Sequence, residues 1–263
     1  MRDFIPGKVF LVGAGPGDPE LLTLKALRLL QSADVVVHDR LVSDGIMALI
    51  PAGVRRIDVG KMAGHHKVAQ DRINGMLVEL ARKGLTVVRL KGGDPLIFGR
   101  GSEEAAELRA AGISVTHVPG ITAAQGAAAS TGVPLTHRGL ATGVRYVTGH
   151  RAGDARLDLD WASLASEETT LVVYMGAANI AEISFQLMRH GMSAALPVLA
   201  VASATTPREE RFLSTLGSIA ADVATTAPDA PVLFVIGRVA ALYDQIALAD
   251  ALTCDGAGMA AYA

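Results

Sequence analysis

The stretch Val9-Phe10-Leu11-Val12-Gly13-Ala14-Gly15-Pro16-Gly17-Asp18-Pro19 decides the fold. It begins as an apolar run, Val9–Val12, and passes directly into a glycine-rich turn. A short apolar run bounded by turn residues is typical of a strand buried on both faces of a parallel sheet. A glycine-rich turn after such a strand lets a ligand approach the backbone closely. The stretch therefore predicts an α/β fold with a ligand near the end of its first strand.

Similar runs recur along the rest of the chain, with helical stretches between them. In the helical stretch after residue 70, apolar residues recur at the three- and four-residue spacing of one helix face: Ile73, Met76, Leu77, Leu80 and Ala81. The first set of strands is completed by residues 35–37, 54–59, 85–90 and 114–118. A second set is expected at residues 144–148, 170–174, 197–202, 211–214 and 232–236.

The alternation of strands and helices predicts an α/β fold of two domains, with mostly parallel central sheets and an active-site cleft between them. The loop near residues 136–142 looks like the break between the two sets of strands. We therefore expect an N-terminal α/β domain over residues 1–139 and a C-terminal α/β domain over residues 140–246. Residues 247–263 are rich in Ala, Gly and Asp and are expected to form a flexible tail.

Composition excludes several classes of protein. The 263 residues carry a formal net charge of −2, whereas nucleic-acid binders usually present a basic face. No apolar run approaches the roughly 18–20 residues of a membrane span, and the N-terminus lacks a signal peptide, so a cytoplasmic protein is expected. Cys254 is the only cysteine, which excludes disulfides and cysteine-based metal sites. His65-His66 lies in a polar loop where neighbouring side chains point apart, so no metal site is expected.

The first glycine-rich turn has an obvious alternative, a dinucleotide-binding fingerprint. That pattern fails at its third glycine, where Asp18 stands and would repel a pyrophosphate. Pro16 also removes an amide that a phosphate would need. A nicotinamide-dependent enzyme is therefore disfavoured.

A second motif, Lys91-Gly92-Gly93-Asp94-Pro95-Leu96-Ile97-Phe98-Gly99-Arg100, also follows a predicted strand. Ligands of open α/β sheets bind beyond the carboxyl ends of the strands. The two glycines expose amides there, and Asp94 supplies an acceptor for a ribose hydroxyl or an ammonium group. The motif is not a phosphate-binding P-loop, because the Gly-Lys-Ser/Thr ending is absent.

The two motifs together resemble the tetrapyrrole methyltransferase superfamily, also called class III methyltransferases. The resemblance runs from about Lys8 to Tyr243. Four further segments resemble the family within it that methylates uroporphyrinogen III: 38–43 (His-Asp-Arg-Leu-Val-Ser), 118–123 (Val-Pro-Gly-Ile-Thr-Ala), 134–138 (Pro-Leu-Thr-His-Arg) and 147–150 (Val-Thr-Gly-His). His38 departs from the tyrosine that this family often carries, and it leaves the Asp39-Arg40 pair intact.

The resemblance implies that S-adenosyl-L-methionine binds in the interdomain cleft, in a folded conformation, and leaves as S-adenosyl-L-homocysteine. From the N-terminal domain, the motif match assigns cofactor binding to Pro16, Gly92, Gly93, Asp94, Ile97, Thr122 and Ala123. From the C-terminal domain it assigns Met175 and Ala204, with Ala230 as a weaker candidate. Small residues such as Ala123 and Ala204 suit a place where an adenine plane lies against backbone.

The resemblance also implies a substrate with eight carboxylates. Arginine grips carboxylates with two parallel hydrogen bonds, so we expect Arg40, Arg100 and Arg138 to bind them. Glu103 is expected to pair with Arg100 or to bind a pyrrole N–H. His150 is expected to reach a substrate carboxylate.

For catalysis, Asp39 is the expected proton acceptor, with Lys61 as a proton donor. A guanidinium group does not ordinarily act as a base. We therefore expect Arg100 to orient the substrate and to stabilise charge.

The implied reaction is methylation of uroporphyrinogen III at C-2 and C-7, giving precorrin-2 by way of precorrin-1 for siroheme, cobalamin or heme d1 synthesis. Relatives are homodimers, so a homodimer acting on a small molecule, without nucleic-acid or membrane partners, is expected. A later precorrin methyltransferase of cobalamin synthesis is one alternative, and the Thr-His-Arg and Thr-Gly-His segments argue against it. A module that senses the cofactor without turnover is another, and the set Asp39, Lys61 and Arg100 argues against that.

Overall fold

The computed structural model describes residues 7–60, 70–150, 157–226 and 230–246. The chain forms two compact units, Met1–Ala123 and Ala124–Ala263, and each is described by itself. This division falls ahead of the expected boundary at residues 139/140, because the helix α5 (Ala123–Thr131) belongs almost entirely to the second unit. There the Ala124 amide donates to the Tyr174 hydroxyl at 3.1 Å. The expected tail, 247–263, lies outside the described residues.

The first unit is built on a five-stranded sheet in the order β3-β2-β4-β1-β5, and every neighbouring pair is parallel. All five strands expected in this part of the chain are present. They are β1 (Lys8–Gly13), β2 (Val35–His38), β3 (Arg55–Asp58), β4 (Val87–Lys91) and β5 (Ser114–Val118). The central strand is β4, whose five side chains are all buried.

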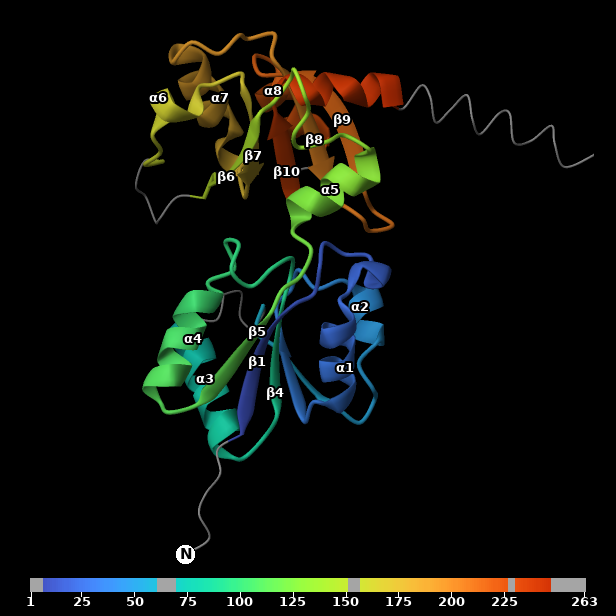
Figure 1. Ribbon diagram of the computed structural model, residues 1–263, viewed down its shortest axis with the longest axis vertical. Helices are drawn as coiled ribbons and strands as arrows, with labels where there is room; N and C mark the ends of the chain where they lie inside the picture. Colours follow the sequence, from blue (N-terminus) through green and yellow to red (C-terminus); the bar gives the residue numbers. More distant parts are fainter. Residues whose placement is uncertain (1–6, 61–69, 151–156, 227–229, 247–263) are drawn as a thin grey trace, which may run out of the picture. The chain divides into compact units, whose positions relative to one another are not determined.

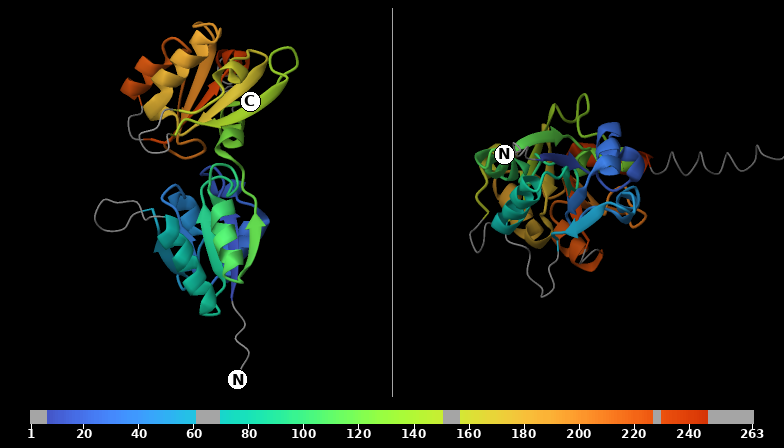
Figure 2. Two further views of the ribbon diagram at one scale, coloured as in Figure 1. Left: turned by 90° about the vertical axis from the view of Figure 1, so that its left-hand side faces the viewer. Right: turned by 90° about the horizontal axis from the view of Figure 1, so that it is seen from below.

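Helices cover both faces of the first sheet, α1 (Leu24–Ser32) and α2 (Asp44–Ala48) on one and α3 (Gln70–Arg82) and α4 (Gly101–Ala110) on the other (Figure 1). Helices α3 and α4 lie side by side (Figure 2). The apolar face expected for α3 is confirmed, because four of its five residues are buried and Met76 is partly buried. A short 3-10 turn, η1 (Pro19–Leu21), follows the first glycine-rich turn.

The second unit is also built on a five-stranded sheet, in the order β6-β7-β10-β8-β9. Its strands again match the expected runs: β6 (Gly143–Thr148), β7 (Thr169–Tyr174), β8 (Pro197–Ala202), β9 (Glu210–Thr215) and β10 (Val232–Ile236). Only β6 and β7 pair in parallel, and the other three pairs are antiparallel. The sheet is therefore mixed, and it differs from the mostly parallel sheet that we expected.

The difference arises at one connection. Strand β8 passes to β9 through residues 203–209 without a helix, and a short link of this kind joins antiparallel strands. Helix α8 (Ile219–Thr226) connects β9 to β10, so β10 runs in the same direction as β9 and opposite to β7 and β8. Strand β10 lies between β7 and β8 in the sheet. Wherever a helix connects two successive strands of the sheet, the strands run in the same direction. The one connection without a helix therefore reverses both β9 and β10.

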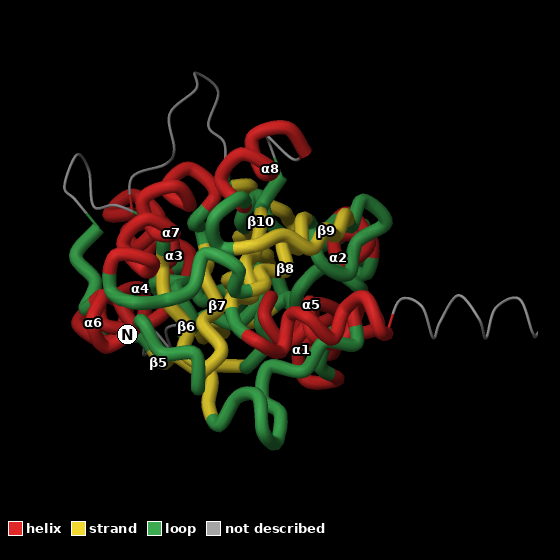
Figure 3. The backbone as a smooth tube through the Cα atoms, turned by 90° about the horizontal axis from the view of Figure 1, so that it is seen from above, coloured by secondary structure: helices red, strands yellow, loops and turns green. Residues whose placement is uncertain are grey.

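Helices α6 (Trp161–Leu164), α7 (Ile180–Arg189) and α8 gather along one side of the second sheet (Figure 3). Their apolar side chains, such as Ile183 and Leu187, form one core with the sheet residue Phe234. Two short 3-10 turns, η2 (Ala177–Asn179) and η3 (Arg238–Ala241), complete the unit. The helices that the structure describes are all too short or too polar to span a lipid bilayer.

Candidate active site

Three glycine-rich loops meet at the carboxyl end of the first sheet. Gly15 and Gly93 form a β-bridge through two backbone hydrogen bonds, of 3.2 and 2.8 Å. A Cβ atom added to Gly13 would lie 2.5 Å from the Gly93 carbonyl oxygen, and one added to Gly120 would lie 2.2 Å from it. Only glycine permits such an approach. The loops after β1, β4 and β5 are therefore packed backbone against backbone. The amides of Gly15, Gly93 and Gly120 all donate to acceptors within the protein, so the expectation that Gly93 exposes its amide to a ligand is wrong.

Asp94 ties two of these loops together. Its Oδ1 accepts the Leu96 amide at 2.8 Å and its Oδ2 accepts the Gly120 amide at 3.1 Å. These bonds fix the orientation of a half-buried carboxylate, and each oxygen keeps a further lone pair. Asp94 thus fits the expected role of accepting a hydrogen bond from a ribose hydroxyl or an ammonium group.

The remaining cofactor residues expected in the N-terminal domain lie at the same end of the sheet. Pro16 follows β1, Gly92 and Ile97 follow β4, and Thr122 and Ala123 follow β5. Thr122 is buried, and the Ile97 side chain is exposed. The structure therefore brings these residues to one end of the sheet, and their contact with a cofactor stays a prediction.

Four expected residues of the second unit, His150, Met175, Ala204 and Ala230, share the end of the sheet where β7 and β8 finish and β10 begins. We call this the Met175 end of the second sheet. Two pairs of loops touch there. The Ser203 amide donates to the Pro231 carbonyl at 3.0 Å, and a Cβ atom added to Gly149 would lie 2.5 Å from the Gly176 Cα.

Backbone strain in the described residues lies in the second motif, at Met175 and on both sides of Ala204. The non-glycine residues with positive φ are Phe98 (51°), Arg100 (57°), Met175 (54°), Ser203 (48°) and Thr205 (62°). Each costs on the order of 1–3 kcal/mol, and such strain gathers at ligand sites. Two of the five lie in the loop after β4, and three lie at the Met175 end of the second sheet. Both ends therefore have the strained backbone typical of binding sites.

Exposed apolar side chains gather at the same two ends. Eight large apolar side chains are exposed in the described part of the chain. Five of these lie at the two ends: Leu41, Leu96, Ile97, Phe98 and Met175. Exposed apolar groups that cluster on one part of a surface mark ligand or partner sites. The four that belong to the first unit, Leu41, Leu96, Ile97 and Phe98, therefore suit a large, partly apolar ligand at the carboxyl end of its sheet.

The expected proton acceptor, Asp39, belongs to a buried ionic cluster with Arg89, Lys91 and Glu104. Arg89 Nη2 lies 2.5 Å from Asp39 Oδ1, and Arg89 Nε lies 3.1 Å from Glu104 Oε1. Lys91 Nζ lies 3.5 Å from Asp39 Oδ2 and 3.0 Å from Glu104 Oε1. The Asp39 side chain is 29% exposed, whereas the other three side chains are at most 5% exposed.

Sequence reasoning missed this cluster. Lys91 was quoted in the second motif without a role, and Arg89 and Glu104 were not singled out. A signal was present, because Arg89 interrupts a strand, Val87–Lys91, that should be apolar if it is buried on both faces. Burying an ion costs on the order of several kcal/mol, so a charged residue at the centre of a sheet must have partners.

Arg100 and Glu103 form a two-pronged ion pair at the start of α4. Arg100 Nε donates to Glu103 Oε1 at 3.0 Å, and Arg100 Nη2 donates to Glu103 Oε2 at 2.6 Å. The hydrogen bond from Arg100 lowers the pKa of the Glu103 carboxyl, and the bond to Glu103 raises the pKa of the Arg100 guanidinium. Both side chains are about half exposed, so the pair can open toward a ligand. The expected pairing of these two residues is present.

The other expected substrate residues are exposed and lie in different units. Arg40 follows β2, and it has no ion pair among the described residues. Arg138 lies in the turn between His137 and Ala141, which form a β-bridge, and this turn belongs to the second unit. Lys61, the expected proton donor, and the pair His65-His66 lie outside the described residues.

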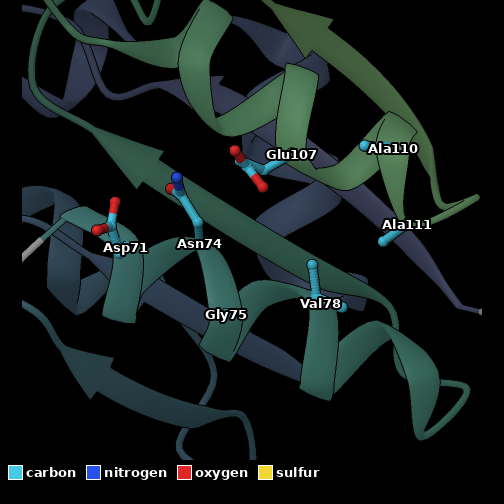
Figure 4. Close-up of a pocket in the computed structure, with 7 residues that line it drawn as sticks. All are labelled: Asp71, Asn74, Gly75, Val78, Glu107, Ala110 and Ala111. Atoms are coloured by element: carbon cyan, nitrogen blue, oxygen red, sulfur yellow. The ribbon is translucent and has the colours of Figure 1, made fainter.

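A groove between α3 and α4 contains none of the expected site residues (Figure 4). It is lined by Asp71, Asn74, Gly75, Val78, Glu107, Ala110 and Ala111. The groove adjoins the ionic cluster, because Gln70 Nε2 donates both to Asn74 Oδ1 (3.0 Å) and to Glu104 Oε1 (3.2 Å). Within the described ranges, no group of three or more His, Cys, Asp or Glu side chains could hold a metal ion.

Comparison with known sequences identifies the family. A family model described as tetrapyrrole (corrin/porphyrin) methylases matches residues 8–220. A uroporphyrinogen-III C-methyltransferase of Paracoccus denitrificans is 67% identical over 94% of this chain and 86% of its own length. A siroheme synthase of Azotobacter vinelandii is 51% identical over 92% of this chain, and the chain spans 52% of that longer protein.

Solved structures give the same result. A uroporphyrin-III C-methyltransferase of Thermus thermophilus, in complex with S-adenosylhomocysteine, has a TM-score of 0.78 at 43% identity and covers 90% of this chain and 100% of its own. A cobalt precorrin-4 methyltransferase has the same TM-score at 28% identity, covering 89% of this chain and 95% of its own. The chain therefore belongs to the tetrapyrrole (corrin/porphyrin) methylase family.

Proposed function

We propose that this chain is an S-adenosyl-L-methionine-dependent methyltransferase that methylates uroporphyrinogen III at C-2 and C-7, giving precorrin-2 by way of precorrin-1. The observation that carries the proposal is the grouping of Asp39, Asp94 and Arg100 at the carboxyl end of one parallel sheet. The 67% identity to a uroporphyrinogen-III C-methyltransferase supports the same substrate. The alternative, a later precorrin methyltransferase, has weaker support, since the cobalt precorrin-4 enzyme is only 28% identical.

The methyl donor fits the residues at the two sheet ends. Its ribose hydroxyls and ammonium group are donors that the fixed Asp94 carboxylate can accept. Its adenine plane needs small side chains, which Ala123, Ala204 and Ala230 supply. A thioether such as that of Met175, which is exposed on strained backbone, makes favourable contacts with an aromatic plane. We therefore propose that residues of both units bind the donor.

The chemistry follows from a donor that carries its own leaving group. An electron-rich pyrrole carbon attacks the methyl carbon of the sulfonium, the S–CH3 bond breaks and S-adenosyl-L-homocysteine leaves. A bridge carbon of the macrocycle then loses a proton. Much of the rate enhancement can come from holding the two reactants at near-attack distance. Asp39 is the proposed proton acceptor, because its carboxylate is the one side chain of its cluster that is partly exposed.

The arginines suit an anionic macrocycle. Arg40 and Arg138 are exposed, and Arg100 is fixed by Glu103, so that its remaining N–H groups can point to a carboxylate. The exposed side chains of Leu41, Leu96 and Phe98 offer apolar surface for the ring. Arg100 thus orients the substrate and stabilises charge, as a guanidinium group can without acting as a base.

One assay tests the function. The purified protein is incubated with uroporphyrinogen III and donor labelled in its methyl group, and the label on the tetrapyrrole is counted while the absorbance of precorrin-2 is followed. Two labels per ring are expected. Donor binding without transfer would instead identify a cofactor-sensing module, and transfer only to a later precorrin would identify the alternative enzyme.

The homodimeric state and the cytoplasmic location stay predictions from the resemblance and from the sequence. Light scattering on the purified protein tests the first, with a mass of twice 27.2 kDa expected.

A further inference from the structure

We propose that Arg89 and Glu104 are positioning residues that hold the Asp39 carboxylate in the orientation in which it accepts a proton. This inference rests on the proposed role of Asp39 in methyl transfer. Neither residue is expected to touch the substrate, because Arg89 is 1% exposed and Glu104 is fully buried. Both act on the reaction through Asp39.

The geometry shows two cations shared between two carboxylates. Arg89 and Lys91 each contact both Asp39 and Glu104, at distances from 2.5 to 3.5 Å. Arg89 is further fixed by donating from Nη1 to the carbonyls of Leu90 (3.3 Å) and Val37 (3.5 Å). Since Asp39 lies at the end of β2 and the two cations lie on β4, these bonds fix the direction of its side chain.

The balance of charge gives Glu104 a second effect. With Glu104 ionised, the cluster holds two positive and two negative charges. Without it, both cations would act on Asp39 alone, and charges interact strongly in a buried site of low dielectric constant. Both cations would then turn toward Asp39, and the direction of its carboxylate would change. Glu104 therefore holds Arg89 and Lys91 where they orient Asp39.

A contribution to the stability of the fold does not explain why this ionic cluster is buried. Arg89 is the largest of the fully buried side chains in the described part of the chain. Glu104 Oε2 is buried and has no hydrogen-bond partner there, which costs free energy. Apolar side chains of similar volume often stabilise a fold at least as well as a buried ion pair does. A costly cluster whose one accessible member is Asp39 points to a role in the reaction.

The test compares Glu104→Gln with Glu107→Gln, a matched control at an exposed position on the same helix. We expect Glu104→Gln to lower the kcat of methyl transfer roughly tenfold or more, a part of the effect of a proton acceptor. The KM for the tetrapyrrole and the Kd for S-adenosyl-L-homocysteine should stay within about twofold, since neither site is touched. Substrate deuterated at its bridge carbons should show a larger isotope effect than with the wild type, because proton removal becomes slower. Glu104→Asp should recover most of the rate.

A double-mutant cycle decides between positioning and mere structural support. If Glu104 acts through Asp39, adding Glu104→Gln to Asp39→Asn should change kcat by less than about twofold. An equal fractional loss in both backgrounds, or an unchanged isotope effect, would overturn the inference. If Glu104→Gln does not fold, Arg89→Lys takes its place in the same cycle, because lysine keeps the charge but loses the forked contact with Asp39 and Glu104. Absence of methyl transfer by the wild type would refute the proposed function itself, and wild-type turnover by Asp39→Asn would refute the inference.

Discussion

The two sheet ends that carry the candidate site differ in chemistry. The carboxyl end of the first sheet presents ionisable side chains, with Asp39 and Asp94 fixed by hydrogen bonds and Arg100 paired with Glu103. Of the residues expected to bind at the Met175 end of the second sheet, Met175, Ala204 and Ala230 are small or apolar and lie on or beside strained backbone, and only His150 is ionisable. A fixed charge can orient or deprotonate a substrate, whereas a shaped apolar surface can only bind. We therefore expect the first unit to carry the chemistry and the second to contribute mainly binding.

The largest expected effect comes from Asp39→Asn, which removes the proposed proton acceptor but keeps the shape of the side chain. We expect kcat to fall by roughly 10²–10⁴-fold, the usual contribution of general acid–base catalysis. The Kd for S-adenosyl-L-homocysteine, measured by calorimetry, should change less than about twofold. Turnover near the wild-type rate would remove Asp39 from the mechanism. It would also contradict the view that the first unit carries the chemistry.

The next effect concerns the binding surface of the second unit. Ala204 is buried between two residues with positive φ, so Ala204→Leu should fill space that the donor needs. We expect the Kd for S-adenosyl-L-homocysteine to rise about 10- to 100-fold, equivalent to roughly 1.4–2.7 kcal/mol. Ala195→Leu, at an exposed position before β8, is the matched control and should bind as the wild type does. Unchanged affinity in Ala204→Leu would exclude this loop from donor binding.

Arg138 tests whether the second unit also contacts the substrate. Loss of a hydrogen bond to a charged group costs about 1.5–3 kcal/mol, so Arg138→Ala should raise the KM for uroporphyrinogen III about tenfold or more. Cofactor affinity should be nearly intact. Arg189→Ala, at an exposed position at the end of α7, serves as the control. Equal loss of substrate and cofactor binding would indicate that Arg138 supports the fold of its turn instead.

The smallest effect is expected from the pair Arg100–Glu103. The folded-state pKa of Glu103 is lowered from its ordinary value of 4.5, so the pair is fully formed above that pH and is lost only as the pH falls through the lowered value. Glu103→Gln should therefore reduce kcat/KM by a few-fold, on the scale of an exposed ion pair, by a factor that is constant between pH 6 and 9. A ratio of variant to wild-type rates that changes across this range would show that another group titrates with Glu103.

The sequence predicted the strands well and their directions less completely. All ten expected strands are present, because most of them read as apolar runs between turn residues, whatever their direction in the sheet. The reversal of β9 and β10 was not predicted, although residues 203–209 between β8 and β9 showed no helical pattern. The direction of a strand depends on whether a helix connects it to the strand before it. The length of the connection, and not its composition, indicates whether a helix can fit there.

The candidate site was likewise predicted only in part from the sequence. Glycine-rich loops at strand ends, such as the one holding Asp94, are local patterns and were predicted. The ionic cluster around Asp39 was not, because its members lie 50 and 15 residues apart along the chain and meet only in the folded sheet. A buried arginine in a strand indicates that it has ionic or hydrogen-bond partners, but the sequence alone does not identify those partners.

The location of the cofactor tests the central claim most directly. Crystals of the protein grown with S-adenosyl-L-homocysteine should show the ligand against Gly92, Gly93 and Asp94, with its adenine beside Ala204 and its sulfur on the side of Asp39. A ligand bound elsewhere, without contact to Asp94, would contradict the account.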